Sequence, residues 1–203
     1  MNYENLVENL TNHGFVVKQF QTKEEVANFF SDTIHQKTIG VGGSLSVKEC
    51  NIDQVLEKDN TVYWHWNQEL IKEYGVHKVQ EMASKAQIYL SSANAIAQTG
   101  EIVNIDGIGN RISATAFGHE QVYFIIGKNK ICANLEEAMF RAKNVAAPKN
   151  AQRLKKNTPC AEKADRCYDC NCNDRICNGT LIIERPMGNI EMIVILVEED
   201  LGA

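Results

Sequence analysis

The sequence lacks the features that mark membrane-spanning and secreted proteins. No apolar run reaches the roughly 18 residues that a membrane-spanning helix needs. The first residues, MNYENLVENLTNHG, are acidic and amphipathic, whereas a signal peptide opens with basic residues followed by an apolar stretch. These absences predict a cytoplasmic protein with no membrane partner. In that compartment, clustered cysteines are more often metal ligands or redox groups than disulfides.

An excess of basic residues is also missing. The chain carries 21 Lys and Arg against 26 Asp and Glu, a formal net charge of −5. Binding to nucleic acid needs a basic face that neutralises phosphates, so no nucleic-acid partner is expected. The 203 residues are 44% hydrophobic, which is enough for one sizeable core.

Several catalytic motifs are absent as well. The five histidines form no HExxH pair, and no serine stands in a GxSxG elbow. The first glycine-rich turn does not match GxGxxG and lacks the lysine of GxxxxGK[ST]. Cys50 and Cys132 have no recognisable base beside them in sequence and are expected to be small buried residues.

Short strand-like stretches alternate with helical ones along the chain. The expected strands are residues 15–20, 37–41, 61–66, 87–90, 101–105, 122–126, 181–184 and 190–198. Helices between strands at this spacing predict βαβ units, and hence an α/β domain with a mostly parallel sheet over residues 1–203. The last two strands are close enough in sequence to predict a β-hairpin at one edge. Residues 148–179, first basic and then cysteine-rich, are interpreted as an insertion packed on this domain.

The first motif is a glycine turn, IGVGGSLSVKE, at residues 39–49. A strand, a glycine turn and a helix start suit an anion, because glycines let the backbone approach closely and the first amides of a helix lack internal partners. Gly42, Gly43 and Ser44 are therefore candidate anion-binding residues. A tight turn whose glycines serve packing alone remains the alternative.

The second motif is EIVNIDGIGNR, at residues 101–111. Ligands of open parallel sheets sit beyond the carboxyl ends of the strands, so this turn should lie at the same edge as the first. Asp106 is a candidate general base, and Arg111 a candidate clamp for a carboxylate or phosphate. A satisfied aspartate in a turn and a surface arginine are the alternative.

The third motif, TPCAEKADRCYDCNCNDRICNG at residues 158–179, holds five of the seven cysteines. Without Cys172, the others read C-x6-C-x2-C-x6-C, four thiols spaced symmetrically about a CxxC turn. The candidate metal ligands are Cys160, Cys167, Cys170 and Cys177. Four thiolates suit either a [4Fe–4S] cluster, which we favour, or zinc. A reduced, loosely ordered loop or disulfides formed during purification are the alternatives.

Taken together, these motifs, with SSANAIAQTG at residues 91–100 and VYFIIGKNKI at residues 122–131, resemble the lactate-utilisation (LUD-domain) family. The match runs over nearly the whole chain and includes a C-terminal cysteine motif found in stand-alone members. The resemblance implies a Rossmann-like open sheet of the sugar-phosphate isomerase and coenzyme-A transferase type. It also implies association with bacterial L-lactate oxidation beside iron–sulfur subunits.

Carried across by position, the resemblance adds residues to the candidate site. Gly42, Gly43 and Ser44 match the glycine loop, and Cys160, Cys167, Cys170 and Cys177 match the cysteine pattern. The family stretch SSANAIAQTGEIVNIDGIGNR, residues 91–111, is matched at Asn94, Asp106, Gly107, Asn110 and Arg111.

Three hypotheses of function follow. The first is a redox-linked protein of small hydroxy-acid metabolism, with an Fe–S centre beside an anion pocket. The second is an isomerase-like or transferase-like enzyme with Asp106 as base and a structural zinc. The third is a non-catalytic subunit or regulator of an oxidase complex with iron–sulfur partners. A homodimer is the prior expectation for the assembly.

Overall fold

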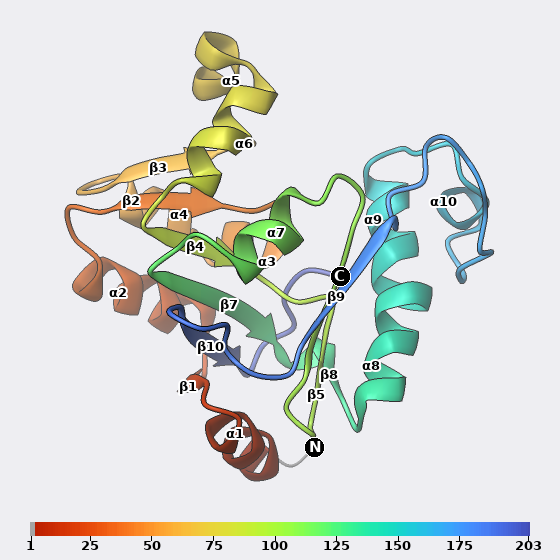
Figure 1. The fold of residues 1–203 in the computed structure, drawn as a ribbon, viewed down its shortest axis with the longest axis horizontal. Helices are drawn as coiled ribbons and strands as arrows, with labels where there is room; N and C mark the ends of the chain where they lie inside the picture. The colour runs from red at the N-terminus through yellow and green to blue at the C-terminus, as the bar shows by residue number, and fades with distance from the viewer. Residues whose placement is uncertain (1–2) are drawn as a thin grey trace.

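Two β-sheets flanked by helices make up the computed structural model, which describes residues 3–203 (Figure 1). None of the helices within that range is both long and apolar enough to cross a membrane. The α-helices are α1 (Tyr3–Asn12), α2 (Lys23–Thr33), α3 (Leu45–Glu49), α4 (Ile52–Leu56), α5 (Gln68–Tyr74), α6 (Val76–Ser84), α7 (Asn110–Ala116), α8 (Leu135–Arg141), α9 (Ala147–Arg153) and α10 (Pro159–Lys163).

The larger sheet has six strands, and every neighbouring pair is parallel. Its spatial order is β1 (Val16–Phe20), β10 (Glu191–Val197), β7 (Gln121–Gly127), β4 (Ile88–Ser91), β2 (Thr38–Val41) and β3 (Thr61–Trp64). The predicted α/β class and the open, Rossmann-like parallel sheet are confirmed. The eight strands expected from the sequence are all present, with ends shifted by one or two residues in most cases.

A second sheet was not expected from the sequence. Its order is β8 (Ile131–Cys132), β5 (Ala95–Ala97), β6 (Ile102–Asp106) and β9 (Gly179–Ile183), with β6 antiparallel to both β5 and β9. β5 and β8 are too short to show a strand pattern in the sequence. Strand β6 therefore belongs to this sheet, and the prediction that it lies in the same parallel sheet as β2 was wrong.

The predicted terminal β-hairpin was also wrong. β9 joins the smaller sheet, whereas β10 lies in the larger sheet between β1 and β7. Six of the seven residues of β10, MIVILV, are buried. A continuous apolar run of this kind suits a central strand of a parallel sheet, which is covered on both faces, and not an edge strand.

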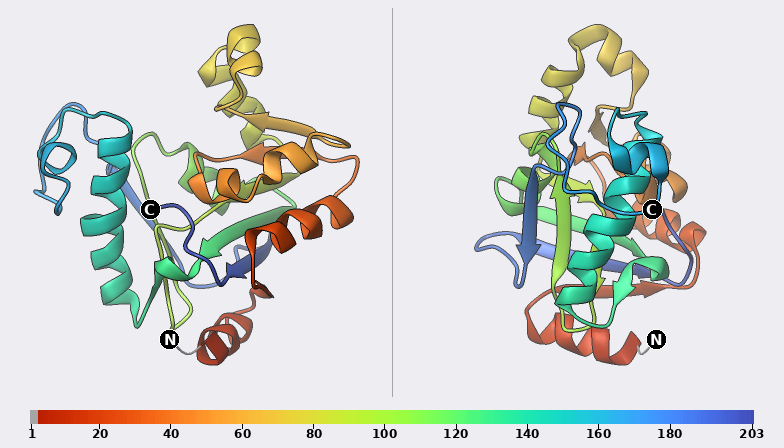
Figure 2. Two further views of the ribbon diagram at one scale, coloured as in Figure 1. Left: turned by 180° about the vertical axis from the view of Figure 1, so that it is seen from behind. Right: turned by 90° about the vertical axis from the view of Figure 1, so that its right-hand side faces the viewer.

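The sheets are stacked in layers with helices between and outside them (Figure 2). One core lies where α2, α3 and α4 cover one face of the larger sheet. A second core joins the other face to α1, α6, α7 and the smaller sheet. The third core packs α8 against the far side of the smaller sheet. The smaller sheet is thus held between the main sheet and the long helix that begins at α8.

This long helix continues through Pro148, where the sequence suggested a boundary. A π-helical turn, Ala142–Ala146, joins α8 to α9. Proline has no amide hydrogen, and its ring clashes with the carbonyl group of the preceding turn, so a local change of helical pitch is expected beside it. The helix thereby reaches the carboxyl edge of the main sheet, and the cysteine segment follows it.

Close packing at Gly40 gives a test of the fold. A Cβ atom there would lie 2.2 Å from the carbonyl oxygen of Ala83 in α6. We expect Gly40→Ala to lower the free energy of unfolding by about 2 kcal/mol or more, because backbone must move to make room. Gly188→Ala is the matched control, since its Cβ would meet nothing within 4 Å. Equal urea midpoints for the two variants would contradict the packing of α6 on β2.

Candidate functional site

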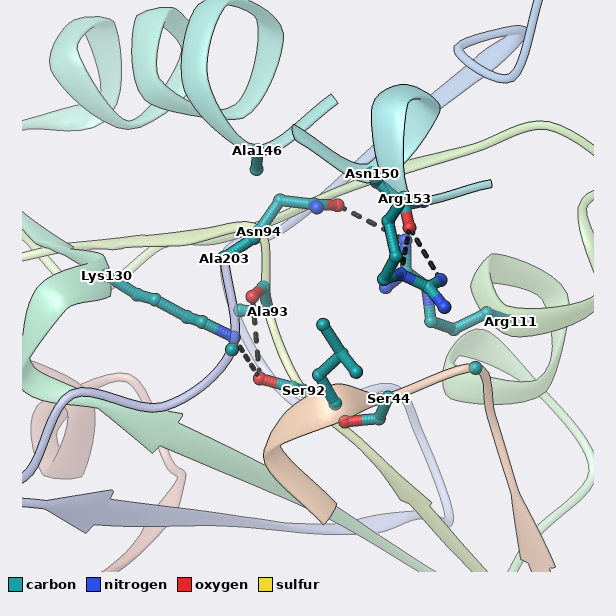
Figure 3. Close-up of a pocket in the computed structure, with 13 residues that line it drawn as sticks. Ser44, Ser92, Ala93, Asn94, Arg111, Lys130, Ala146, Asn150, Arg153 and Ala203 are labelled. Atoms are coloured by element: carbon teal, nitrogen blue, oxygen red, sulfur yellow. Dashed lines mark hydrogen bonds between the residues drawn. The ribbon is translucent and has the colours of Figure 1, made fainter. Parts of the chain in front are cut away.

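Loops from both sheets meet around a cavity at the carboxyl end of the central strands. The inner pocket has a volume of about 50 Å³. Its polar or charged lining side chains are Ser44, Ser92, Asn94, Arg111, Lys130, Asn150 and Arg153. It adjoins an outer cleft of about 430 Å³, which shares Gly43, Arg111, Asn150 and Arg153 with it. Figure 3 shows the inner pocket between the loop after β4, the glycine turn and α9.

The cavity is basic although the chain is acidic overall. Among the described residues, five basic side chains line the two spaces: Arg111, Lys130, Arg153, Lys156 and Arg175. The only Asp or Glu side chains of residues 3–203 that line these spaces are Asp106 and Asp174, and Asp174 accepts a hydrogen bond from the amide of Asn157 at 3.1 Å. A basic, partly enclosed cavity favours a small anion.

Lys130 is the most deeply buried of these cations, and the sequence reasoning did not select it. It ends the short 3-10 helix Lys128–Lys130 after β7, with only 4% of its surface exposed. Its Nζ donates to Ser46 Oγ and Ser92 Oγ, both at 2.9 Å. Burial lowers the pKa of Lys130 to about 7, and the charges of Arg141 and Arg111 add to that effect.

The chain end closes over Lys130. Gly202 has a φ of +64°, and a Cβ there would lie 3.1 Å from Lys130 Nζ. The backbone amide of Leu201 donates a hydrogen bond to Asn129 Oδ1 at 3.1 Å, and the backbone amide of Lys128 donates one to the carbonyl oxygen of Glu199 at 3.0 Å. These contacts fix the turn that carries Lys130 and shield its amine from water.

Arg111 reaches the pocket from α7 and is largely buried. Its Nη2 donates to Asn94 Oδ1 at 3.2 Å and also to the carbonyl of Ile105. Burial lowers the pKa of Arg111, against the charge of Asp106, which raises it. The second arginine, Arg153, lies 5.1 Å from the ring centroid of Trp66 and donates through Nη2 to Asn150 Oδ1 at 2.7 Å.

Asp106 is occupied by backbone donors. Oδ1 accepts from the amides of Ile108 at 3.2 Å and Gly109 at 3.3 Å, and Oδ2 accepts from those of Arg111 at 3.1 Å and Ile112 at 3.3 Å. Arg111 Nε lies 3.8 Å from Oδ2. This carboxylate caps the start of α7, so its contacts favour a structural role over the predicted role as a base.

Of the remaining predicted anion-site residues, some line the two cavities and one lies behind the lining. Gly43 and Ser44 line the inner pocket, whereas Gly107 and Asn110 line the outer cleft. Gly42 lies behind them: its amide donates to the carbonyl of Leu90 at 2.9 Å and is not available to a ligand.

Ser44 caps α3, as its Oγ accepts from the amide of Val47 at 3.2 Å. Because a hydroxyl can accept and donate at once, its hydrogen is still available to a ligand in the inner pocket.

The cysteine segment forms one wall of the outer cleft. Residues 173–176, between Cys172 and Cys177, line it together with Asp106 and His65. The amide of Asn178 donates to the carbonyl of Asp106 at 2.9 Å, and a Cβ at Gly107 would lie 3.0 Å from Ile176 Cα. The segment is thus anchored directly to the second glycine turn.

The four predicted ligands, Cys160, Cys167, Cys170 and Cys177, do not form a preorganised metal site. Over residues 3–203, no three His, Cys, Asp or Glu side chains converge as a metal-binding group. All five thiols of the segment are free and partly buried.

Electrostatics nevertheless link these thiols. Burial raises the pKa of Cys177, and the charges of Cys167 and Cys170 raise it further, against the charge of Arg175. A hydrogen bond with Cys170 raises the pKa of Cys172. The thiols of Cys167, Cys170, Cys172 and Cys177 are therefore near enough to one another to interact.

Two further cleft residues were underestimated from the sequence. His65 lies beside Gly43 in the outer cleft, and burial lowers its pKa, against the charge of Asp106. Arg153 lies in α9, whereas the sequence predicted that this helix ends near Val145.

For Lys130 a sequence signal existed. It lies three residues after the carboxyl end of the apolar strand β7, at the edge of the sheet where α/β proteins bind ligands.

The fold is that of an open parallel-sheet α/β protein with a basic cleft at the carboxyl end of its central strands. The chain belongs to the LUD domain family, whose sequence model matches residues 3–197. No curated protein matches the sequence. A crystal structure of a DUF162 family protein from Deinococcus radiodurans is similar, with a TM-score of 0.51 and 10% sequence identity, covering 96% of this chain and 95% of that chain. At this identity the likeness shows the fold alone.

The burial of Lys130 predicts how stability depends on pH. Its pKa falls from 10.5 to about 7 on folding, so between these values the unfolded chain binds one more proton than the folded one. Between pH 7.5 and 9.5 we expect the unfolding free energy of the wild type to rise relative to Lys130→Met, by up to about 1.4 kcal/mol per pH unit. Chemical denaturation at several pH values measures it. Parallel pH profiles for the two proteins would contradict a neutral, buried amine.

Proposed function

We propose that the protein binds a small carboxylic acid of the 2-hydroxy or 2-oxo type in the inner pocket, and acts in metabolism of the lactate-utilisation type. The observation that carries this proposal is the meeting of Arg111, Arg153 and Lys130 around one small, polar cavity. A cavity holds about one water for each 10–15 Å³ of this volume, so about 50 Å³ suits only a few ligand atoms at its base.

The chemistry of the lining supports a carboxylate with a neighbouring oxygen function. The two guanidinium groups are suited to a carboxylate, for which planar paired donors are the best match. The hydroxyl of Ser44 and the side chain of Asn94, beside them, can bond a hydroxyl or carbonyl oxygen. The isomerase-like or transferase-like hypothesis with Asp106 as base is less favoured, because four backbone amides already occupy that carboxylate.

Binding of lactate or pyruvate tests the proposal by titration calorimetry. We expect saturable binding of the acids and none of lactamide, which lacks the negative charge. Arg153→Gln should weaken binding about 10-fold, because it removes a charge-assisted hydrogen bond. Arg185→Gln, at an exposed position outside the cavity, is the charge-matched control and should bind as the wild type does. Equal affinities for acid and amide, or equal losses in both variants, would refute an anion site here.

The cysteine segment supports a second proposal, that Cys160, Cys167, Cys170 and Cys177 take up a metal centre when the segment closes around it. Support comes from five thiols in a stretch with little regular structure, on a wall of the same cleft. A bound [4Fe–4S] cluster would supply one-electron transfer, whereas zinc would act as a structural clamp. The redox character of the function depends on which of these is found.

Anaerobic purification followed by iron, sulfide and zinc analysis tests the second proposal. We expect Cys170→Ser to lose most of the bound metal and Cys172→Ser to keep it, because only Cys170 belongs to the symmetrical set. Cys50→Ser, in the main core, is the control for general damage. Absence of iron and zinc from the wild type, or equal losses in the Cys170 and Cys172 variants, would contradict the assignment.

A further inference from the structure

Lys130 is a buried amine that has no anionic partner among the described residues. No carboxylate of residues 3–203 forms an ion pair with it, and its two partners are the hydroxyl groups of Ser46 and Ser92. Burial is the largest cause of the lowered pKa of Lys130, and the charges of Arg141 and Arg111 lower it further. Glu49 is near enough to raise this pKa, but its effect is smaller. A structural lysine in such a place would be expected to have a carboxylate beside it.

The hydrogen bonds around Nζ suit a neutral amine. Ser92 Oγ also contacts the carbonyl oxygen of Ile125, which can only accept, so the hydroxyl donates there and accepts from Lys130. If Ser46 accepts in the same way, the two hydrogens of a neutral amine are both used. The nitrogen lone pair is then the one position on Nζ that no described residue engages.

The pocket has groups that could hold a carbonyl compound beside the amine of Lys130. The guanidinium groups of Arg111 and Arg153 favour a carboxylate in the same cavity as Nζ, so a carbonyl group bonded to that carboxylate lies within the pocket as well. Ser44 has a hydroxyl hydrogen available for the carbonyl oxygen. A lysine that is desolvated and placed beside other cations is a recognised form of activated amine nucleophile.

We propose that Lys130 is a catalytic nucleophile that forms an iminium adduct with a 2-oxo acid held by Arg111 and Arg153. This inference rests on the proposed function, because it requires the carboxylate to bind in the inner pocket. It narrows the substrate class to acids that carry a carbonyl group beside the carboxylate, or that acquire one in the reaction.

The step balances without an external oxidant. The lone pair of Nζ attacks the carbonyl carbon, and a proton moves from nitrogen to oxygen to give a carbinolamine. Protonation of that hydroxyl releases water as the nitrogen lone pair forms the C=N bond. Overall, one amine, one oxo acid and one proton yield one iminium ion and one water. The iminium withdraws electrons from the neighbouring carbon, which makes proton exchange there easier.

Reductive trapping tests the inference. The full-length protein is incubated with pyruvate and sodium cyanoborohydride at neutral pH, and the modified residue is located by peptide mass spectrometry. We expect one reduced pyruvate per chain, on Lys130, formed roughly 10-fold to 100-fold faster than on exposed lysines, because those remain almost wholly protonated. Lys130→Arg keeps a cation but should lose the adduct. Lys128→Arg, at the exposed position two residues earlier, should retain it.

A second readout uses the same variants. Exchange of the pyruvate methyl protons with deuterium, followed by NMR, should be accelerated by the wild type and by Lys128→Arg, and not by Lys130→Arg. Oxalate, which has no ketone carbonyl but carries the negative charges, should protect Lys130 from trapping.

The outcomes separate the two proposals. Pyruvate that binds in calorimetry without an adduct on Lys130, or with label spread evenly over surface lysines, would overturn the nucleophile and leave the anion site in place. Absence of binding, trapping and exchange together would overturn both.

Discussion

The carboxylate of Asp106 holds the site together. By accepting four backbone amides it fixes the start of α7, the helix from which Arg111 enters the pocket. The carbonyl of the same residue accepts from Asn178, where the cysteine segment returns to the smaller sheet as β9. The wall that carries the arginine and the wall that carries the cysteines are therefore positioned by one residue. These contacts favour an organising role for Asp106 in the cleft.

Around that cap, the protein places positive charge where water is largely excluded. Hydrogen bonds to the protein replace those that buried side chains would make to water. Arg111 donates to the carbonyl of Ile105 and to Asn94 Oδ1, and Lys130 donates to the hydroxyl groups of Ser46 and Ser92. Arg111 also lies 3.8 Å from Asp106 in an ion pair, whereas Lys130 forms none with the described residues, and burial disfavours the charged state of both side chains. Side chains whose pKa is shifted by burial concentrate at functional sites.

Hydrophobic patterning predicted the strands and the α/β class, because each βαβ unit is a local feature of the chain. The smaller sheet could not be predicted, since β5 and β8 are two or three residues long and depend on partners far away in sequence. The candidate site was found in part: Gly43, Ser44, Asn94 and Arg111 do meet in one pocket. They do so through the packing of two sheets, and not at the edge of one sheet as predicted. Arg153 was missed because a single arginine gives no pattern. Lys130 was missed although it lies just after an apolar strand, because its burial is visible only in three dimensions.

The cysteine segment and the inner pocket are neighbours, linked by the outer cleft, which Asp106, Gly107 and the residues before Cys177 line. We propose that the inner pocket holds a small acid between Arg111 and Arg153, with its carbonyl carbon facing Lys130. A crystal structure of the protein with a bound 2-oxo acid is the decisive measurement. We expect density for the carboxylate between the two guanidinium groups, with the carbonyl carbon within reach of Lys130 Nζ. Density for the acid outside the inner pocket, with Lys130 still paired only to Ser46 and Ser92, would contradict it.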